Sequence, residues 1–124
     1  MKEIRGGVEN LRPIVSLQIE GCLTPLDFLV DTGFTGELML PQRLTKKLGL
    51  EDMGPEIFTT ASGEEVNTRI YRGFRGFINW FERRTAVGVL ATPGNQALVG
   101  TQLLASCKLK IDFPEEKVKI TKLV

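Results

Sequence analysis

Residues 28 to 41 read FLVDTGFTGELMLP, an apolar segment that is interrupted by polar residues and two glycines before it becomes apolar again. An apolar strand, Phe28 to Val30, runs directly into the carboxylate of Asp31 and then into a Thr-Gly pair. A charge at the end of a buried strand is costly in free energy unless another group pairs with it. The position of Asp31 therefore needs an explanation, which the rest of the chain has to supply.

The bulk composition fits one globular domain over residues 1–124, with 42% hydrophobic and 25% charged residues. The 16 Lys and Arg and the 15 Asp and Glu leave a net charge of +1, so nothing indicates a nucleic-acid partner or a membrane surface. No segment approaches the ~20 apolar residues of a transmembrane helix. Residues 1–10 also lack the apolar stretch of a signal peptide, so we expect a cytoplasmic protein.

The sequence contains no histidine and two cysteines, Cys22 and Cys107. The absence of histidine excludes Ser-His-Asp and Cys-His catalysis, together with zinc sites that use imidazole ligands. The cysteines are far apart and have no metal-ligand spacing, so we expect them to be reduced packing residues. We expect neither a metal nor any other cofactor.

Short segments with a period of two predict a mainly β fold. The expected strands and strand-rich segments are residues 11–20, 26–30, 38–40, 57–60, 66–71, 73–81, 85–91, the start of 97–109 and the tail 109–124, the last a hairpin around Pro114. A short helix is expected after Pro41 with Gly49 as its C-terminal cap, and a helical turn is expected after Gly100. Many short strands with one or two short helices indicate a small closed barrel or a sandwich.

Two segments of the chain resemble each other. Residues 28–32 read FLVDT and residues 97–101 read ALVGT, so each has an apolar residue, Leu, Val, one special residue and Thr. Each segment follows a predicted strand pair and precedes a helical segment. We therefore expect two related halves packed about a pseudo-twofold axis.

On its own, the Asp-Thr-Gly sequence is weak evidence for a catalytic site, because Asp and Gly form turns in many unrelated loops. Its surroundings make it more informative. Gly33 lets the backbone turn sharply beneath the carboxylate of Asp31, and Thr32 offers a hydroxyl that can tie the turn to a group opposite. A second glycine, Gly36, and the apolar stretch 38–40 complete a compact unit.

The ordered set of motifs resembles the retropepsin-like aspartic proteases (clan AA), in particular their small prokaryotic single-domain members. The motifs span nearly the whole chain in the order of that family. They are Leu29-Val30-Asp31-Thr32-Gly33, Pro41 to Leu50 ending in Leu-Gly-Leu, Ala61-Ser62-Gly63, Leu98-Val99-Gly100 followed by Leu103-Leu104, and the closing Leu109 to Phe113. The resemblance implies a small closed barrel, mainly β, of two pseudo-twofold-related halves.

The resemblance also implies an aspartic endopeptidase in which each chain supplies one aspartate. In a homodimer, Asp31 of the two subunits would share one proton and activate a water molecule for attack on a peptide or protein substrate. Thr32 would brace the two loops across the dimer axis, and Gly33 would approach the substrate backbone. Because Gly100 occupies the corresponding position in the second half, one chain would hold half of a site.

Further roles follow from the same resemblance. Ala61, Ser62 and Gly63 would form the tip of a flap that closes over a bound peptide. Gly100 would pack closely behind the active-site loop. Phe34 stands where retroviral members usually carry a small residue, and its ring would either narrow the cleft or pack inward.

Two other interpretations stay open. A retropepsin-like module could bind peptides or dimerise without cleaving anything, although an intact Asp-Thr-Gly favours the protease. Alternatively, Asp31 could merely cap a turn in a β-barrel, which would then be a stable monomer.

Overall fold

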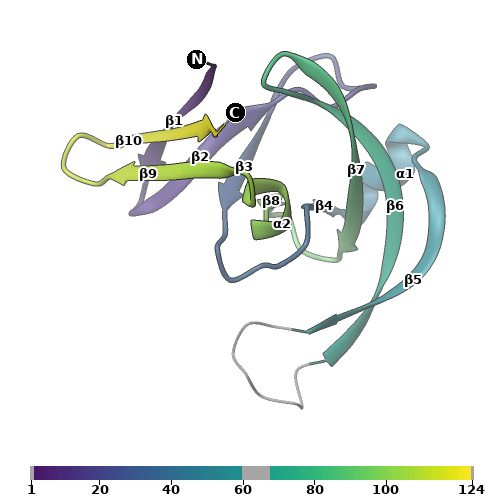
Figure 1. Cartoon of the computed structure of the whole chain (residues 1–124). Coiled ribbons are helices and arrows are strands. Elements are labelled where there is room, and N and C mark those ends of the chain that lie inside the picture. The colour runs from purple at the N-terminus through teal and green to yellow at the C-terminus, as the bar shows by residue number, and fades with distance from the viewer. Residues whose placement is uncertain (1, 60–67, 124) are drawn as a thin grey trace.

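The computed structural model describes residues 2–59 and 68–123, which form one ten-stranded sheet with the order β5-β6-β7-β4-β8-β3-β2-β1-β10-β9 (Figure 1). The prediction of a mainly β fold is confirmed. The strands are β1 (Glu3–Glu9), β2 (Arg12–Leu17), β3 (Leu26–Val30), β4 (Leu38–Pro41), β5 (Glu51–Thr59), β6 (Thr68–Trp80), β7 (Arg83–Thr92), β8 (Leu98–Val99), β9 (Cys107–Asp112) and β10 (Lys117–Lys122).

Two short helices accompany the sheet in the described parts of the chain, α1 (Gln42–Leu48) and α2 (Thr101–Leu104). They have seven and four residues, whereas a helix needs about 20 to cross a bilayer. Helix α1 ends at Gly49, as the sequence predicts. Gly49 has a left-handed φ of 61°, and its N–H donates to the carbonyl oxygen of Lys46 at 3.1 Å.

The strand order has two ends, β5 and β9, so the closed barrel expected from the sequence is corrected to an open, strongly curved sheet. Apart from the strand ladders, the described residues form one isolated antiparallel bridge, between Ile19 and Ile78 of β6, which links the chain just after β2 to the other part of the sheet. Two backbone hydrogen bonds of 2.9 Å flank this bridge. The bridge does not lengthen into a ladder because the chain turns away at Gly21, where φ is 100°. The pseudo-twofold relation stays a prediction.

The N-terminal part of the sheet differs from the expected single strand over residues 11–20. It consists of the hairpin β1–β2, whose turn residues Asn10 and Leu11 have φ values of 50° and 63°. Two consecutive positive φ angles suit a tight hairpin turn, because they match the twist of the flanking strands. Strand β1 escaped prediction because Gly6 and Gly7 interrupt its alternation.

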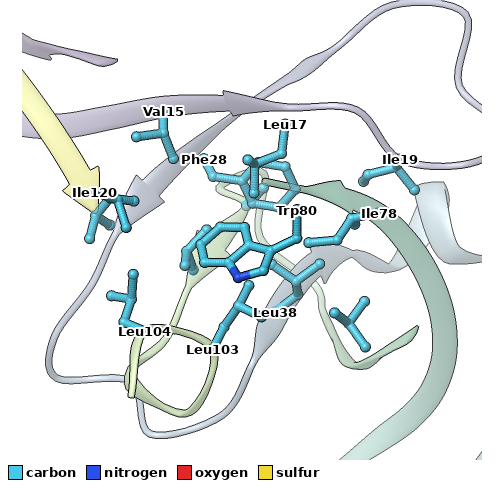
Figure 2. Packing of buried hydrophobic residues seen from close by; sticks show 14 of the residues in the cluster. Val15, Leu17, Ile19, Phe28, Leu38, Ile78, Trp80, Leu103, Leu104 and Ile120 are labelled. Carbon is cyan, nitrogen blue, oxygen red and sulfur yellow. The ribbon is translucent and has the colours of Figure 1, made fainter. Parts of the chain in front are cut away.

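The hydrophobic core fills the concave side of the curved sheet. Figure 2 shows the ring of Trp80 in the middle of a cluster that includes Phe28, Leu38 and Leu103. Phe28 is fully buried and Trp80 is 6% exposed, so Trp80 belongs to the core. Each such side chain contributes about 1.5–3 kcal/mol by leaving water. The strand that leads into Asp31 is therefore anchored firmly.

Candidate active site

The two similar segments, residues 28–32 and 97–101, lie side by side in the structure. Their strands β3 and β8 pair in parallel and in register. The N–H of Asp31 continues this pairing by donating to the carbonyl oxygen of Val99 at 2.9 Å. Asp31 therefore leaves the sheet beside the point where β8 ends at Gly100.

Asp31 begins a tight turn and is half-buried. Its Oδ1 accepts a hydrogen bond from the N–H of Gly33 at 2.9 Å, and its carbonyl oxygen accepts one from the N–H of Phe34 at 3.1 Å. Thr32 and Gly33 form the tip of the turn and are exposed. The turn fixes the carboxylate relative to β3 and leaves its tip open to contact by another molecule.

Gly33 is needed at this tip for space rather than for an unusual backbone angle. Among the described glycines, positive φ angles occur at Gly21, Gly49 and Gly54 and not at Gly33. A Cβ atom on Gly33 would lie 3.2 Å from Oδ1 of Asp31, tighter than most Cβ contacts in proteins. The glycine therefore leaves room for the carboxylate.

Gly100 lies directly behind the loop of residues 31–37. Its N–H donates to the carbonyl oxygen of Glu37 at 2.9 Å, and the N–H of Thr101 donates to the carbonyl oxygen of Phe34 at 2.8 Å. The first N–H groups of a helix have no partner within it. Here the loop carbonyls supply those partners, so α2 holds the Asp31 loop against the sheet.

Phe34 packs inward, which decides between the two orientations left open by the sequence. It is 2% exposed and forms a small apolar cluster with Met39 and Leu90. A Cβ atom on Gly36 would lie 2.6 Å from Cζ of Phe34, so the glycine makes room for the ring. The ring anchors the loop from beneath.

A hollow of about 370 Å³ opens beside the loop, lined by Thr35, Gly36, Glu37, Glu56, Gly88, Leu90 and Gln102. The Oε1 atom of Glu37 accepts a hydrogen bond from the N–H of Gly88 at 2.8 Å. The carboxyl group of Glu56 lies over Gly73, where a Cβ atom would be 2.9 Å from its Cδ. Both carboxylates therefore lie against glycines of the sheet, and the hollow carries negative charge.

Sequence reasoning missed Glu37 and Glu56. Nothing in the local sequence distinguishes them from solvated glutamates. The only feature of the sequence that could have indicated these contacts is the presence of Gly73 and Gly88 inside strands. Glycine inside a strand often marks the close approach of another group.

The predicted flap residues Ala61, Ser62 and Gly63 lie outside the described residues. The predicted hairpin around them is confirmed on both sides: β5 and β6 pair from Glu51 with Arg75 to Thr59 with Thr68. In Figure 1 this hairpin forms a long arm. The end of the arm at which β5 ends and β6 begins lies on the same side of the molecule as the connection between β3 and β4.

Comparisons with known proteins agree with this geometry. The model of the aspartyl protease family matches residues 15–103, and the chain therefore belongs to the aspartyl protease family. None of the curated proteins matches the chain in sequence.

The solved structures that are similar to it include two proteases. A retropepsin-like aspartic protease from Rickettsia conorii has 16% identity and a TM-score of 0.63, over 97% of this chain and 90% of that one. The protease of simian foamy virus has 15% identity and a TM-score of 0.54, over 74% of this chain and 91% of that one. These likenesses show the fold, and the retropepsin-like resemblance is confirmed.

Proposed function

We propose that this protein is an aspartic endopeptidase that acts as a homodimer, with Asp31 of both subunits in one active site. The observation that carries the proposal is the turn at Asp31, in a chain of the aspartyl protease family. Its carboxylate is held by the N–H of Gly33 at 2.9 Å, next to an exposed tip.

The second carboxylate has to come from another copy of the chain. Gly100 follows Val99 in β8 just as Asp31 follows Val30 in the neighbouring parallel strand β3. The position that corresponds to Asp31 within the same chain therefore offers no acidic group. Two exposed Thr32-Gly33 tips meeting about a twofold axis would bring the two aspartates together in an isologous contact.

The chemistry follows from placing two carboxylates a few ångströms apart. Such a pair holds one proton, because two adjacent negative charges repel each other. The ionised Asp31 takes a proton from water, and the protonated Asp31 donates to the carbonyl oxygen of the scissile peptide. The water attacks directly, without a covalent intermediate on the enzyme. Thr32 would brace the two loops, and Gly33 would lie against the substrate backbone.

The substrate would bind as an extended peptide between the paired loops and the arm formed by β5 and β6. Ala61, Ser62 and Gly63 would close over it as the flap tip, and backbone pairing would supply affinity. Gly100 supports the site indirectly, because it holds the Asp31 loop in place.

The decisive experiment compares cleavage of a diverse peptide pool by wild-type protein and by Asp31→Asn, from acidic to neutral pH. The amide oxygen of Asn still accepts the Gly33 hydrogen bond, so the variant should keep its fold while losing all cuts. Asp27→Asn is the matched control, because Asp27 is an exposed carboxylate on β3, the strand that leads into Asp31. Cuts that persist in Asp31→Asn would overturn the proposal.

A mixing experiment tests the shared site. Wild-type protein is incubated with increasing amounts of Asp31→Asn under conditions that allow subunits to exchange, and the dimer is followed by sedimentation. Activity should fall as mixed dimers form, whereas Asp27→Asn should leave it unchanged. A sedimenting dimer that cleaves nothing at any pH would favour the non-catalytic peptide-binding module.

A further inference from the structure

The strands β1, β10 and β9 form one end of the sheet, away from the arm of β5 and β6 (Figure 1). Residues of β10 such as Val118 and Ile120 are buried in the core, so alternate residues face outward. The strand register places nine residues on this outer side, which we call the basic face. Its three cross-strand rows are Glu3–Thr121–Lys108, Arg5–Lys119–Lys110 and Gly7–Lys117–Asp112.

The basic face concentrates positive charge in a protein that is nearly neutral. Five of its nine residues are Lys or Arg and two are acidic, whereas the whole chain carries a net charge of +1. The middle row, Arg5, Lys119 and Lys110, is entirely cationic. Like charges directly opposite each other destabilise a sheet. An arrangement that costs stability indicates a role other than folding.

The charges of the basic face are only partly neutralised within the chain. Glu3 accepts a hydrogen bond from Nε of Arg5 at 2.8 Å, and its other oxygen lies 3.8 Å from Nζ of Lys119. Lys108, Lys110 and Lys117 make no ion pair with any residue of the described ranges. These three ammonium groups are therefore available to an outside partner.

Protection of a sheet edge explains only part of this pattern. Strand β9 ends the sheet, and lysines on an edge strand commonly prevent unwanted pairing. Lys117 and Lys119, however, lie on β10, which is paired on both sides by β1 and β9. A hollow of about 290 Å³ lies here, and Arg5, Lys110, Lys117 and Lys119 are among its lining residues.

We propose that the basic face binds an acidic peptide segment in extended conformation, which adds as a strand to the free edge of β9. In strand addition the main chain supplies hydrogen bonds, and every second side chain points to the same face. Acidic residues at two alternate positions would then lie beside Lys108 and Lys110. None of the nine residues is aromatic, so the face lacks the stacking platforms with which proteins bind single-stranded nucleic acids.

The test measures fluorescence anisotropy of a labelled eight-residue peptide of alternating Glu and Thr at low ionic strength. The protein carries Asp31→Asn, so that the result does not depend on cleavage. Adding Lys108→Glu and Lys110→Glu should weaken binding at least about tenfold, and a Lys-Thr peptide should then bind instead. The matched control is Lys46→Glu with Lys47→Glu, two exposed lysines on α1, which should leave the affinity unchanged.

Four outcomes would overturn the proposal. One is no binding of the Glu-Thr peptide, and a second is equal weakening by the control variant. The third is equal affinity for a peptide of the same composition with its glutamates in one block, because strand addition requires alternation. The fourth is equally tight binding of oligo-dT or of anionic vesicles with the same sensitivity to Lys108→Glu and Lys110→Glu, which would indicate a phosphate-binding surface. Circular dichroism confirms that each variant is folded.

Discussion

The backbone of Gly100 lies so close to Gly36 that a Cβ atom at position 100 would come well within 3.0 Å of the Gly36 carbonyl oxygen. The φ angle of Gly100 is −103°, which any residue can adopt, so the glycine is required for space. We predict that Gly100→Ala pushes the Asp31 loop away from α2. Overpacking of this kind costs about 1–3 kcal/mol, and cleavage should fall more steeply than stability.

The measurement is urea unfolding together with peptide cleavage. Gly94→Ala serves as the control, because a Cβ atom there would meet its nearest neighbour at an ordinary 3.6 Å. If Gly100→Ala retained wild-type stability and activity, the tight support of the loop by α2 would be refuted.

Phe34 anchors the same loop from the other side. We predict that Phe34→Ala costs about 3–5 kcal/mol, because the ring is 2% exposed and its removal leaves a cavity beside Met39 and Leu90. Phe34→Leu should cost less, since it retains more apolar volume. Urea unfolding measures both changes. Phe113→Ala, at a residue that is 48% exposed, should change stability by no more than about 0.5 kcal/mol. If Phe34→Ala and Phe113→Ala lowered the stability by similar amounts, Phe34 would not be an anchor of the loop.

The hollow with Glu37 and Glu56 predicts a substrate preference for the proposed peptidase. Peptides with Lys or Arg near the scissile bond should have lower KM values than matched peptides with Met, because the two carboxylates attract a cation. Glu37→Gln with Glu56→Gln should remove this preference while cleavage of the Met peptide continues. The measurement is kcat and KM on both peptides.

The control for this prediction is Glu9→Gln, at an exposed glutamate of β1 far along the sheet from the hollow. Loss of all cleavage in the double variant would show that the two glutamates support the loop rather than select the substrate. An unchanged preference would show that basic side chains do not enter the hollow.

The ion pair of Arg84 and Glu20 predicts a pH-dependent contribution to stability. The hydrogen bond from Arg84 lowers the pKa of Glu20 below its ordinary value of 4.5. A lowered carboxyl pKa stabilises the folded state above the ordinary value, and this contribution is lost as the pH falls through the folded-state value. Both side chains are exposed, so the contribution is small.

Glu20→Gln should therefore destabilise the protein slightly at neutral pH, and the difference should be smaller at an acidic pH at which the Glu20 carboxyl is protonated in both the folded and the unfolded state. Urea unfolding at the two pH values measures this gap. If wild type and Glu20→Gln differed in stability by the same amount at both pH values, the charge of Glu20 would contribute nothing. The ion pair with Arg84 would then not stabilise the segment next to the Ile19–Ile78 bridge.

The sequence revealed the features that depend on neighbouring residues. The turn at Asp31, the cap at Gly49 and the hairpin around Pro114 all carry local signals, and the structure contains a turn, a helix end and a hairpin at these places. The similarity of residues 28–32 and 97–101 also had structural meaning, since the two segments are neighbouring strands.

The remaining features depend on contacts between distant segments. Closure of the sheet depends on how many residues pair around the bridge between Ile19 and Ile78. No pattern near either residue specifies the length of that pairing. The hollow likewise requires Glu37 and Glu56 to meet glycines on other strands. Because a period of two reports only which face of a strand is buried, it could predict neither outcome.

The support of the Asp31 loop by α2 can form only after both segments have been synthesised. Phe34 and Thr101, which join the Asp31 loop to α2, are 67 positions apart. At roughly 5–20 residues per second, the ribosome needs about 3–13 s to make the second partner after the first. During that interval the loop lacks its support, and the proposed second aspartate belongs to a different molecule. If the proposed function is correct, a newly made chain would stay inert until it met a second finished copy.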